Sequence, residues 1–206
     1  MDEILKYFPN LSDLQRSRFE ALQALYADLN AKVNVISRKD IGNLYVNHVL
    51  HSLVIAKFIT PRPSTRFIDL GCGGGFPGIP LAIIWPDCEF HLIDRIGKKV
   101  NVARTVAEAI GLENTTFQHG DSGECRQKFD YVVSRAVMAL PDLMRASQHL
   151  VAAKDRNKLP NGLICLKGGD LDAEIAATRR DILDVPLTDY FSEPYFETKH
   201  LLYTPL

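Results

Sequence analysis

Several features that would mark special classes of protein are scarce in this chain of 206 residues. Its formal net charge is only −1, so it is not a general polycation, and any nucleic-acid binding must come from a local patch. No apolar run approaches the roughly 18 residues of a membrane span, and the acidic opening Met1-Asp2-Glu3 is unlike a signal peptide. We therefore expect a cytoplasmic protein that does not cross a membrane.

Cysteine is also scarce. The four cysteines at positions 72, 88, 125 and 165 are far apart, with no C-x-x-C pair and no metal-ligand spacing. We expect them to be reduced core residues, and we expect no metal site. Hydrophobic residues make up 46% of the chain, which is enough for one full core, or for one domain with an extension.

Charge is distributed unevenly. Basic residues predominate in residues 31–67, where Asp40 is the lone acid, and again in residues 95–107. Acids predominate in residues 170–197. The two basic stretches fit RNA binding, although solvated helix faces give similar runs of charge.

The most informative stretch begins with an apolar run that stops at Asp69. Three glycines then alternate at Gly71, Gly73 and Gly75, and Pro77-Gly78 precedes a second apolar run. This pattern predicts a buried strand, a tight glycine turn and a helix start, where a ligand can meet bare backbone and helix N–H groups. An ordinary strand-to-helix turn would need one glycine, so three favour a ligand loop.

The chain before this loop is predicted to be helical. Ser12 to Gln15 form a capping-box pattern ahead of an apolar stripe at helical spacing, and a second helix is expected at 41–59. Pro61 and Pro63 then mark a boundary. We expect residues 1–63 to form a helical extension that packs on a core domain at 64–206, the two together making one folding unit.

The chain from residue 64 alternates between strand and helix patterns. Strands are expected at 66–70, 89–94, 115–118, 129–134 and 163–167, helices at 78–85, 97–110, 140–153 and 171–183, and an antiparallel pair near 189–191 and 199–203. This order predicts an α/β fold with a mostly parallel seven-stranded sheet and helices on both faces.

Ligands of such sheets lie beyond the carboxyl ends of the strands. Asp94 ends the second strand, 23 residues after Gly71, where a carboxylate can accept both hydroxyls of a ribose; it could instead cap the following helix. Asp121, Ser122 and Gly123 end the third strand, where an adenine would lie or where the chain simply turns.

Both NAD and S-adenosylmethionine contain an adenosine, but three features favour the second. Asp69 stands two residues before the first glycine, where it can reach an amino group directly or through water. Pro77 removes an N–H that a pyrophosphate would use. Only about 130 residues follow the loop, which leaves no room for the catalytic domain of a dehydrogenase.

Several segments now support a specific resemblance. They are DLGCGGGFPGIPL at 69–81, NVIS at 34–37, HVLHSL at 48–53, DRIGKK at 94–99, FD at 129–130 with SRA at 134–136, and LKG at 166–168. In this order they resemble the bacterial small-subunit ribosomal RNA guanine-N7 methyltransferases, the RsmG or GidB family.

The resemblance implies a class I S-adenosylmethionine-dependent methyltransferase, Rossmann-like in fold, that methylates N7 of a guanine in 16S ribosomal RNA, alone or in the 30S subunit. It implies cofactor contacts at Gly71, Phe76, the Ser122-Gly123 backbone and Arg135, with Asp94 on the ribose. Three positions depart from the family pattern: Asn47 and His51 in the second helix, and Asp121 where the family usually has arginine.

The expected chemistry needs no general base. Guanine N7 has an in-plane lone pair and no proton to lose, so an in-line displacement requires alignment alone. After the fourth strand the chain has Ser134-Arg135-Ala136, not the D/N-P-P-Y/F of exocyclic-amine methyltransferases, and it has no Pro-Cys pair. Arg135 is expected to bind the methionine carboxylate or to orient the guanine, unless it forms a structural ion pair with an acid such as Asp130.

The residues expected to contact RNA are basic side chains near the mouth of the site and one histidine. They are Lys32, Arg38, Lys39, His48, Arg95, Lys98, Lys99 and Lys167. The lysines and arginines could instead be merely solvated, and His48 and His51 could be core-edge residues. Because N7 lies in the deep major groove of an A-form helix, the target base should be unpaired or flipped out.

We expect a monomer. Two alternative functions remain open from the residues: a methyltransferase of the same fold that acts on a small molecule or a protein, and an adenosine-ligand-binding module without catalysis.

Overall fold

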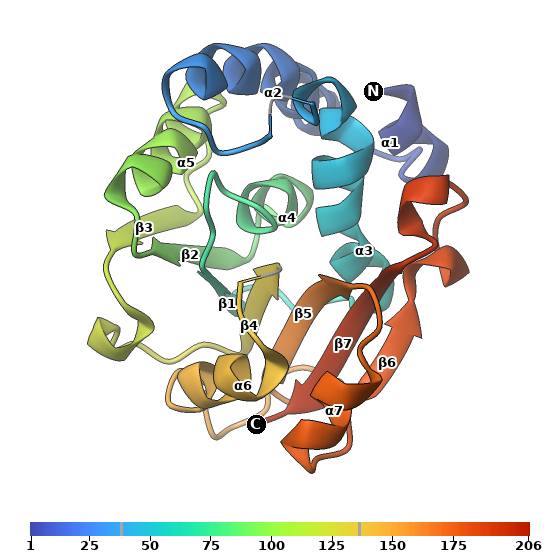
Figure 1. Ribbon diagram of the computed structural model, residues 1–206. Helices are drawn as coiled ribbons and strands as arrows, with labels where there is room; N and C mark the ends of the chain where they lie inside the picture. Colours follow the sequence, from blue (N-terminus) through green and yellow to red (C-terminus); the bar gives the residue numbers. More distant parts are fainter. Residues whose placement is uncertain (38, 136) are drawn as a thin grey trace.

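The computed structural model describes residues 1–37, 39–135 and 137–206. Within these residues seven strands form one sheet in the order β3-β2-β1-β4-β5-β7-β6 (Figure 1). The strands are β1 (Arg66–Leu70), β2 (Glu89–Asp94), β3 (Thr115–His119), β4 (Tyr131–Arg135), β5 (Gly162–Gly168), β6 (Leu183–Pro186) and β7 (Lys199–Pro205).

The first five strands run parallel, and β7 runs antiparallel to both β5 and β6. Asp69 on β1 pairs with Leu92 on β2 and with Val133 on β4, so the order of the strands reverses at β1. In a sheet of this kind the ligand site lies at this reversal, beyond the carboxyl ends of β1 and β4. The expected α/β architecture is confirmed.

The helices cover both faces of the sheet, as Figure 1 shows. On one side lie α2 (Asp13–Lys32), α3 (His51–Phe58), α4 (Gly78–Ile84) and α5 (Gly97–Ala109). On the other side lie α6 (Leu140–Gln148) and α7 (Asp172–Thr178). Among the residues that the structure describes, no helix is long and apolar enough to cross a membrane.

The N-terminal extension lies on the core domain through specific contacts. It begins with α1 (Asp2–Tyr7), and Ser12 and Gln15 form the expected capping box at the start of α2. The Gln15 amide also donates to the carbonyls of Ile83 and Ile84, and the Arg18 guanidinium donates to the Ile110 carbonyl. These bonds join α2 to the ends of α4 and α5.

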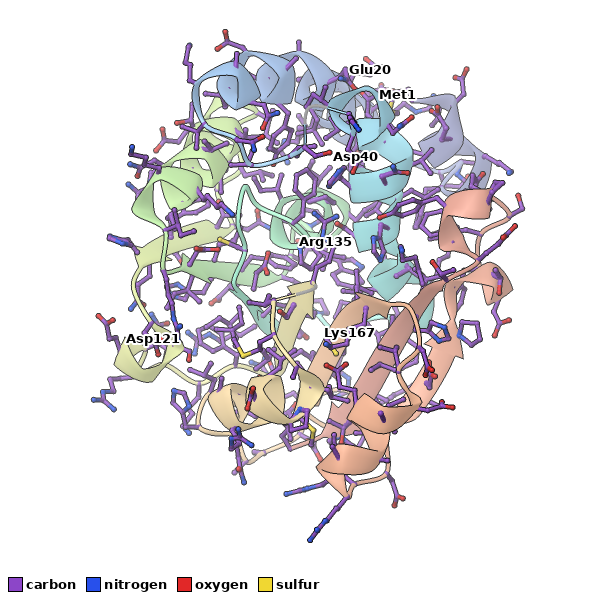
Figure 2. All side chains as sticks on the ribbon, in the orientation of Figure 1. Met1, Glu20, Asp40, Asp121, Arg135 and Lys167 are labelled. Atoms are coloured by element: carbon purple, nitrogen blue, oxygen red, sulfur yellow. The ribbon has the colours of Figure 1, made fainter. Side chains whose placement is uncertain are left out.

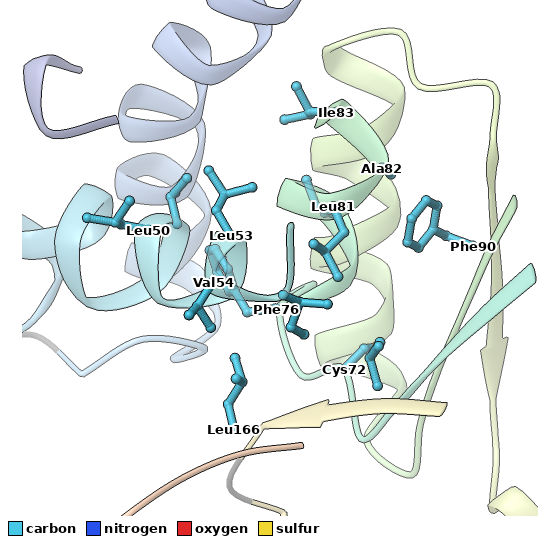
Figure 3. Packing of buried hydrophobic residues seen from close by; sticks show 14 of the residues in the cluster. Leu50, Leu53, Val54, Cys72, Phe76, Leu81, Ala82, Ile83, Phe90 and Leu166 are labelled. Atoms are coloured by element: carbon cyan, nitrogen blue, oxygen red, sulfur yellow. The ribbon is translucent and has the colours of Figure 1, made fainter. Parts of the chain in front are cut away.

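The two parts of the chain also share one hydrophobic core. Leu50, Leu53 and Val54 from the extension are fully buried in the same cluster as Leu81 and Leu166 (Figure 3). Burying each such side chain is worth roughly 1.5–3 kcal/mol, so the extension depends on the core domain for its stability. The boundary near residue 63 therefore does not separate two hydrophobic cores.

The single helix expected at 41–59 is wrong. Residues Ile41–Asn43 form a 3₁₀ turn, Leu44–Leu50 form a π-helix, and only His51–Phe58 are α-helical. The π-helix widens the turn, so that the His51 N–H donates to the carbonyls of Val46 and His48. In an α-helix the same N–H would donate to the Asn47 carbonyl, which here accepts hydrogen bonds from outside the helix.

In the expected antiparallel pair, the strand at 199–203 is confirmed by β7, but its partner lies elsewhere than expected. Residues 189–191 are not a strand; β6 lies at Leu183–Pro186, and Leu187–Asp189 form a 3₁₀ turn. Leu187 and Phe191 are both buried, and the Phe191 N–H donates to the Leu187 carbonyl, because this helical turn directs both side chains into one core.

Two expected helices end early. The helix expected at 140–153 is α6, which ends at Gln148. The helix expected at 171–183 is α7, which ends at Thr178, where Arg179 takes a left-handed φ of 53°. Phe129, expected at the start of the fourth strand, forms only an isolated bridge with Val151.

The four cysteines are buried and free, as expected.

Candidate active site

A cavity of about 680 Å³ lies at the carboxyl ends of β1, β2 and β4. It has the size and position expected for a small-molecule site in this kind of sheet. The predicted site residues that line it are Gly71, Gly73, Phe76, Asp94, Arg95, Lys99, Asp121, Ser122 and Arg135. Asp69, Gly75, Gly123 and Lys98 are not among its lining residues.

The glycine loop needs its glycines for two different reasons. Gly71, Gly73 and Gly75 have φ values of 73°, 54° and 109°, a region that side chains with a Cβ rarely adopt. A Cβ on Gly71 would also lie 2.7 Å from Val137, whereas a Cβ on Gly73 would meet nothing within 4 Å. Gly71 thus permits close packing, and Gly73 presents bare backbone to the open cavity.

Asp94 connects the loop to the start of α5. Its Oδ2 accepts from the Gly73 N–H at 2.8 Å, and its Oδ1 accepts from the Ile96 N–H at 2.8 Å. The alternative that Asp94 caps the next helix is wrong, because the N-cap of α5 is Ile96, although Asp94 does bond to the N–H of that residue. Each oxygen keeps a second lone pair, and Asp94 lines the cavity, so the carboxylate can still accept from a ribose.

Asp69 is fully buried beneath the loop. Its Oδ2 accepts from the Gly78 N–H at 2.7 Å, which fixes the start of α4, and its Oδ1 has no hydrogen-bond partner. Burial raises the pKa of this carboxyl to about 7. Because the side chain does not line the cavity, it cannot touch a ligand directly in this conformation, and only the expected contact through water remains.

The third strand end forms the outer wall of the cavity. Asp121 Oδ1 accepts from the Gly123 N–H at 2.9 Å, and its Oδ2 pairs with Arg95. The Gly123 N–H and the Arg95 guanidinium lower the pKa of Asp121. Asp121 therefore stabilises its own turn, as the simpler interpretation expects, while Ser122 beside it lines the cavity.

Arg135 lies at the centre of the molecule, where Figure 2 labels it below Asp40. Its guanidinium lies 5.0 Å from the centre of the Phe76 ring and hydrogen-bonds to Asn47 and His48. Arg135 does not pair with Asp130, which was the alternative expected from the sequence. Asp130 instead accepts from the Arg66 N–H. Arg135 is thus held at the cavity by the N-terminal extension.

The extension also shapes the glycine loop itself. The Tyr26 hydroxyl donates to the Gly74 carbonyl at 2.7 Å, and Val35 packs against Gly74. The Asn30 amide accepts from the N–H groups of Val35 and Ile36, which holds Val35 in the cavity wall. The NVIS segment at 34–37, which contains Val35, could be singled out from the sequence. The spacing of apolar residues along the helix did not indicate that Tyr26 and Asn30 support this wall.

The basic residues expected to contact RNA have different environments. Lys98 is exposed and precedes Lys99, which lines the cavity, and Lys39 is exposed within the extension. Arg95 and Lys32 are exposed but ion-paired with Asp121 and Asp28. Arg38 lies outside the described residues.

Two of the expected RNA contacts do not fit their positions. The Lys167 ammonium donates to the Met138 carbonyl at 2.8 Å and pairs with Glu174, so it anchors the segment beside the cavity. His48 is 9% exposed, and both of its ring nitrogens are hydrogen-bonded. Both side chains are committed to the fold and are not available to phosphate.

In the described part of the chain, no group of three or more histidine, cysteine or acidic side chains is arranged to hold a metal ion. The Cys72 thiol lines the cavity, and burial raises its pKa well above its usual value, so this thiol is not ionised near neutral pH.

Solved structures with this architecture include a protein in complex with S-adenosylmethionine and a methylase. A mutant of MtNAS in complex with S-adenosylmethionine matches 93% of this chain and 76% of its own, with a TM-score of 0.56 and 14% identity. The ribosomal protein L11 methylase from Lactobacillus delbrueckii subsp. bulgaricus matches 75% of this chain and 76% of its own, with a TM-score of 0.57 and 13% identity. These likenesses confirm the class I methyltransferase fold.

Much nearer relatives share the whole chain. A protein from Bacteroides thetaiotaomicron named Ribosomal RNA small subunit methyltransferase G is 56% identical over the full length of both chains. A protein of the same name from Flavobacterium johnsoniae is 47% identical and covers all of this chain and 98% of its own. The family model GidB, rRNA small subunit methyltransferase G, matches residues 15–193. The expected relationship is confirmed, and the chain belongs to the GidB family of rRNA small subunit methyltransferases.

Proposed function

We propose that this protein transfers a methyl group from S-adenosylmethionine to N7 of a guanine in 16S ribosomal RNA. One observation supports the proposal most strongly: a ligand-sized cavity is lined by bare glycine backbone, the carboxylate of Asp94 and the two arginines Arg95 and Arg135, with no histidine among the described residues that line it. The two carboxylates that line it, Asp94 and Asp121, are occupied by backbone N–H groups. A reaction that only requires alignment fits such a site.

The residues present fit the cofactor. Gly73 leaves the cavity open beside the backbone, and Asp94 faces the space where ribose hydroxyls would lie. Asp69 Oδ1 is a buried acceptor that lacks a partner, in keeping with a water-mediated bond to an amino group. When bound, S-adenosylmethionine supplies a methyl group activated by its sulfonium. The protein supplies the orientation.

Arg135 is the side chain best placed to orient the reacting groups. It lines the cavity, lies over Phe76 and bears a positive charge that suits either the methionine carboxylate or the acceptor edge of guanine. Ser134 beside it donates to the Leu70 carbonyl at 2.7 Å, so this hydroxyl has a structural role. Neither residue needs to remove a proton from guanine N7.

For the substrate surface we propose Lys98, Lys99 and Lys39, because their positions suit phosphate groups around a flipped-out base. Lys99 both lines the cavity and follows Lys98 at the start of α5, which links the RNA surface to the cofactor. We further propose that the protein acts as a monomer in the cytoplasm, with 16S RNA or the 30S subunit as its partner.

Methyl transfer from labelled S-adenosylmethionine tests this function. Purified 16S RNA, 30S subunits, a protein mixture and a set of small metabolites are offered in parallel, each with the protein and with its Gly73→Val variant. We expect label in RNA alone, recovered as 7-methylguanosine after digestion. Label in protein or metabolites would support a different methyltransferase, and cofactor binding without any transfer would support a binding module.

A further inference from the structure

A chain of polar side chains runs from the N-terminal extension to the cavity. Asp40 Oδ2 lies 2.9 Å from His48 Nε2, and His48 Nδ1 lies 3.0 Å from Arg135 Nη2. Figure 2 labels both ends, Asp40 on the extension and Arg135 near the end of β4. Neither Asp40 nor the imidazole touches the cavity, so both act through Arg135.

The chemistry of the three groups fixes the proton on His48. A guanidinium can only donate, so Nδ1 of His48 must be the acceptor and must lack a hydrogen. The ring hydrogen is then on Nε2, where it donates to the Asp40 carboxylate. Arg135 and Asp40 therefore favour the same tautomer, in which Nδ1 accepts from the guanidinium and Nε2 donates to the carboxylate.

The surroundings also keep the imidazole neutral. Burial and the nearby Arg135 charge lower the pKa of His48 to about 4, despite the opposing effect of Asp40. His51 is buried one turn further along, and burial lowers its pKa as well. A neutral His48 accepts from Arg135, whereas an imidazolium would repel it.

The π-helix supplies a second anchor for the same guanidinium. Because the His51 N–H donates to Val46 and His48, it leaves the Asn47 carbonyl to accept from Arg135 Nη1 at 3.4 Å and from the Tyr195 hydroxyl at 3.2 Å. The Phe76 ring supports one face of the guanidinium. Arg135 is thus fixed at two nitrogens and one face, and no other residue that the structure describes bonds to its remaining N–H groups, which can meet a ligand in the cavity.

We propose that Asp40 and His48 are positioning residues, which hold the Arg135 guanidinium in the orientation that the cofactor and the guanine require. This inference rests on the proposed function for the nature of the ligand. The hydrogen-bonded chain Asp40–His48–Arg135, which we call the relay, does not depend on that function. It assigns a purpose to the lone acid of residues 31–67, to the buried histidine and to the π-helix that bears it.

Two substitutions at one position separate positioning from mere packing. His48→Asn keeps an acceptor near the place of Nδ1, whereas His48→Leu keeps the bulk and removes the acceptor. His91→Leu is the matched control, because His91 is buried, bonds through both ring nitrogens to Thr116 and Gln118, and lies outside the cavity. Thermal unfolding of each variant gives the temperature below which binding is measured.

Calorimetric titration with S-adenosylhomocysteine then gives the affinity of each folded variant. We expect His48→Leu to weaken binding about tenfold, the cost of a charge-assisted hydrogen bond that orients a ligand. We expect His48→Asn to stay within about threefold of the parent, and His91→Leu to leave the affinity unchanged. Equal losses in the asparagine and leucine variants, or no loss in either, would overturn the proposal.

The tautomer gives a readout that needs neither ligand nor activity. Nitrogen NMR of the ligand-free protein should show His48 neutral and protonated on Nε2 at pH 7, and Asp40→Ala should shift the Nε2 resonance, because the acceptor for its hydrogen is lost while Arg135 still donates to Nδ1. An Nδ1-protonated or cationic ring would overturn the relay. If the relay is found but no label enters 16S RNA, the proposed function fails and this inference stands.

Discussion

The cavity has two walls that are built in different ways. The open wall, formed by Asp94, Arg95, Lys99 and Asp121, consists of strand ends and the first turn of α5, and its acids bond to backbone close by. The buried wall, formed by Phe76 and Arg135 with His48 and Asp40 behind them, joins the glycine loop, β4 and the extension.

The difference indicates how the two walls work. The open wall is solvated, and its side chains can adapt to a ribose and to phosphate groups. The buried wall has little freedom, because its two charged groups, Arg135 and Asp40, are half-buried and are both hydrogen-bonded to the buried His48. We infer that the open wall contributes binding and that the buried wall contributes alignment.

The largest expected effect is at the loop that joins the two walls. Gly73→Val places a β-branched side chain at a φ of 54° and inside the cavity, so cofactor affinity should fall by about a hundredfold or more. Calorimetry with S-adenosylhomocysteine measures this loss. Gly42→Val is the matched control, since its φ is not left-handed and a Cβ there meets nothing within 4 Å. Parental affinity in Gly73→Val would remove the loop from the site.

The next effect tests the buried wall. Arg135→Lys keeps the charge but loses the planar fork that meets His48 and Asn47 together, so we expect methyl transfer to slow by roughly ten- to a hundredfold. Single-turnover kinetics with saturating cofactor measure the step itself. Arg145→Lys, on an exposed arginine of α6, should leave the rate unchanged. A full rate in Arg135→Lys would show that charge alone is sufficient.

A smaller effect, on RNA binding, is expected when the charges of two lysines at the open wall are reversed. Lys98→Glu with Lys99→Glu should weaken RNA binding about tenfold and lower its salt dependence, while cofactor affinity changes much less. Filter binding over a series of salt concentrations measures both quantities. Lys154→Glu with Lys158→Glu reverses two exposed charges away from the cavity and should have little effect. Equal losses in both pairs would indicate that RNA binding is not confined to the cavity mouth.

The effect with the least bearing on activity is the pH dependence of stability. The pKa of Asp69 is raised from 3.8 to about 7, so the folded state keeps a proton that the unfolded state has lost. Its stabilising contribution is full below pH 4 and is lost as the pH rises to 7, a change on the order of 2–4 kcal/mol. Urea unfolding of the parent and of Asp69→Asn at pH 5 and pH 8 should show a smaller decline in the variant. Identical slopes would place the buried proton elsewhere.

Sequence reasoning predicted the open wall more fully than the buried one. The strand ends, the glycine loop and Asp94 follow from local patterns, since strand, turn and ligand contact lie within a few residues of one another. The relation of Arg135 to His48 and Asp40 could not be predicted, because it joins residues that are 87 and 8 positions apart along the chain. The lone acid Asp40 in a basic stretch was the one available signal.

The errors in the fold have a similar origin. The spacing of apolar residues predicted a continuous helix at 41–59, but tertiary hydrogen bonds to Asn47 accompany a π-helix there. Lys167 looked like a phosphate ligand until its ammonium was seen to bond Met138 and Glu174. In each case a distant partner, invisible to local periodicity, decides what the residue does.

If this site methylates N7 of a guanine in 16S ribosomal RNA, as we propose, nucleoside mapping of that RNA detects the product most directly. RNA from cells with and without this protein is digested and analysed by mass spectrometry. We predict one 7-methylguanosine that disappears when the protein is absent and returns with the parent but not with Gly73→Val. An unchanged set of methylated guanosines in the two RNAs would contradict the account.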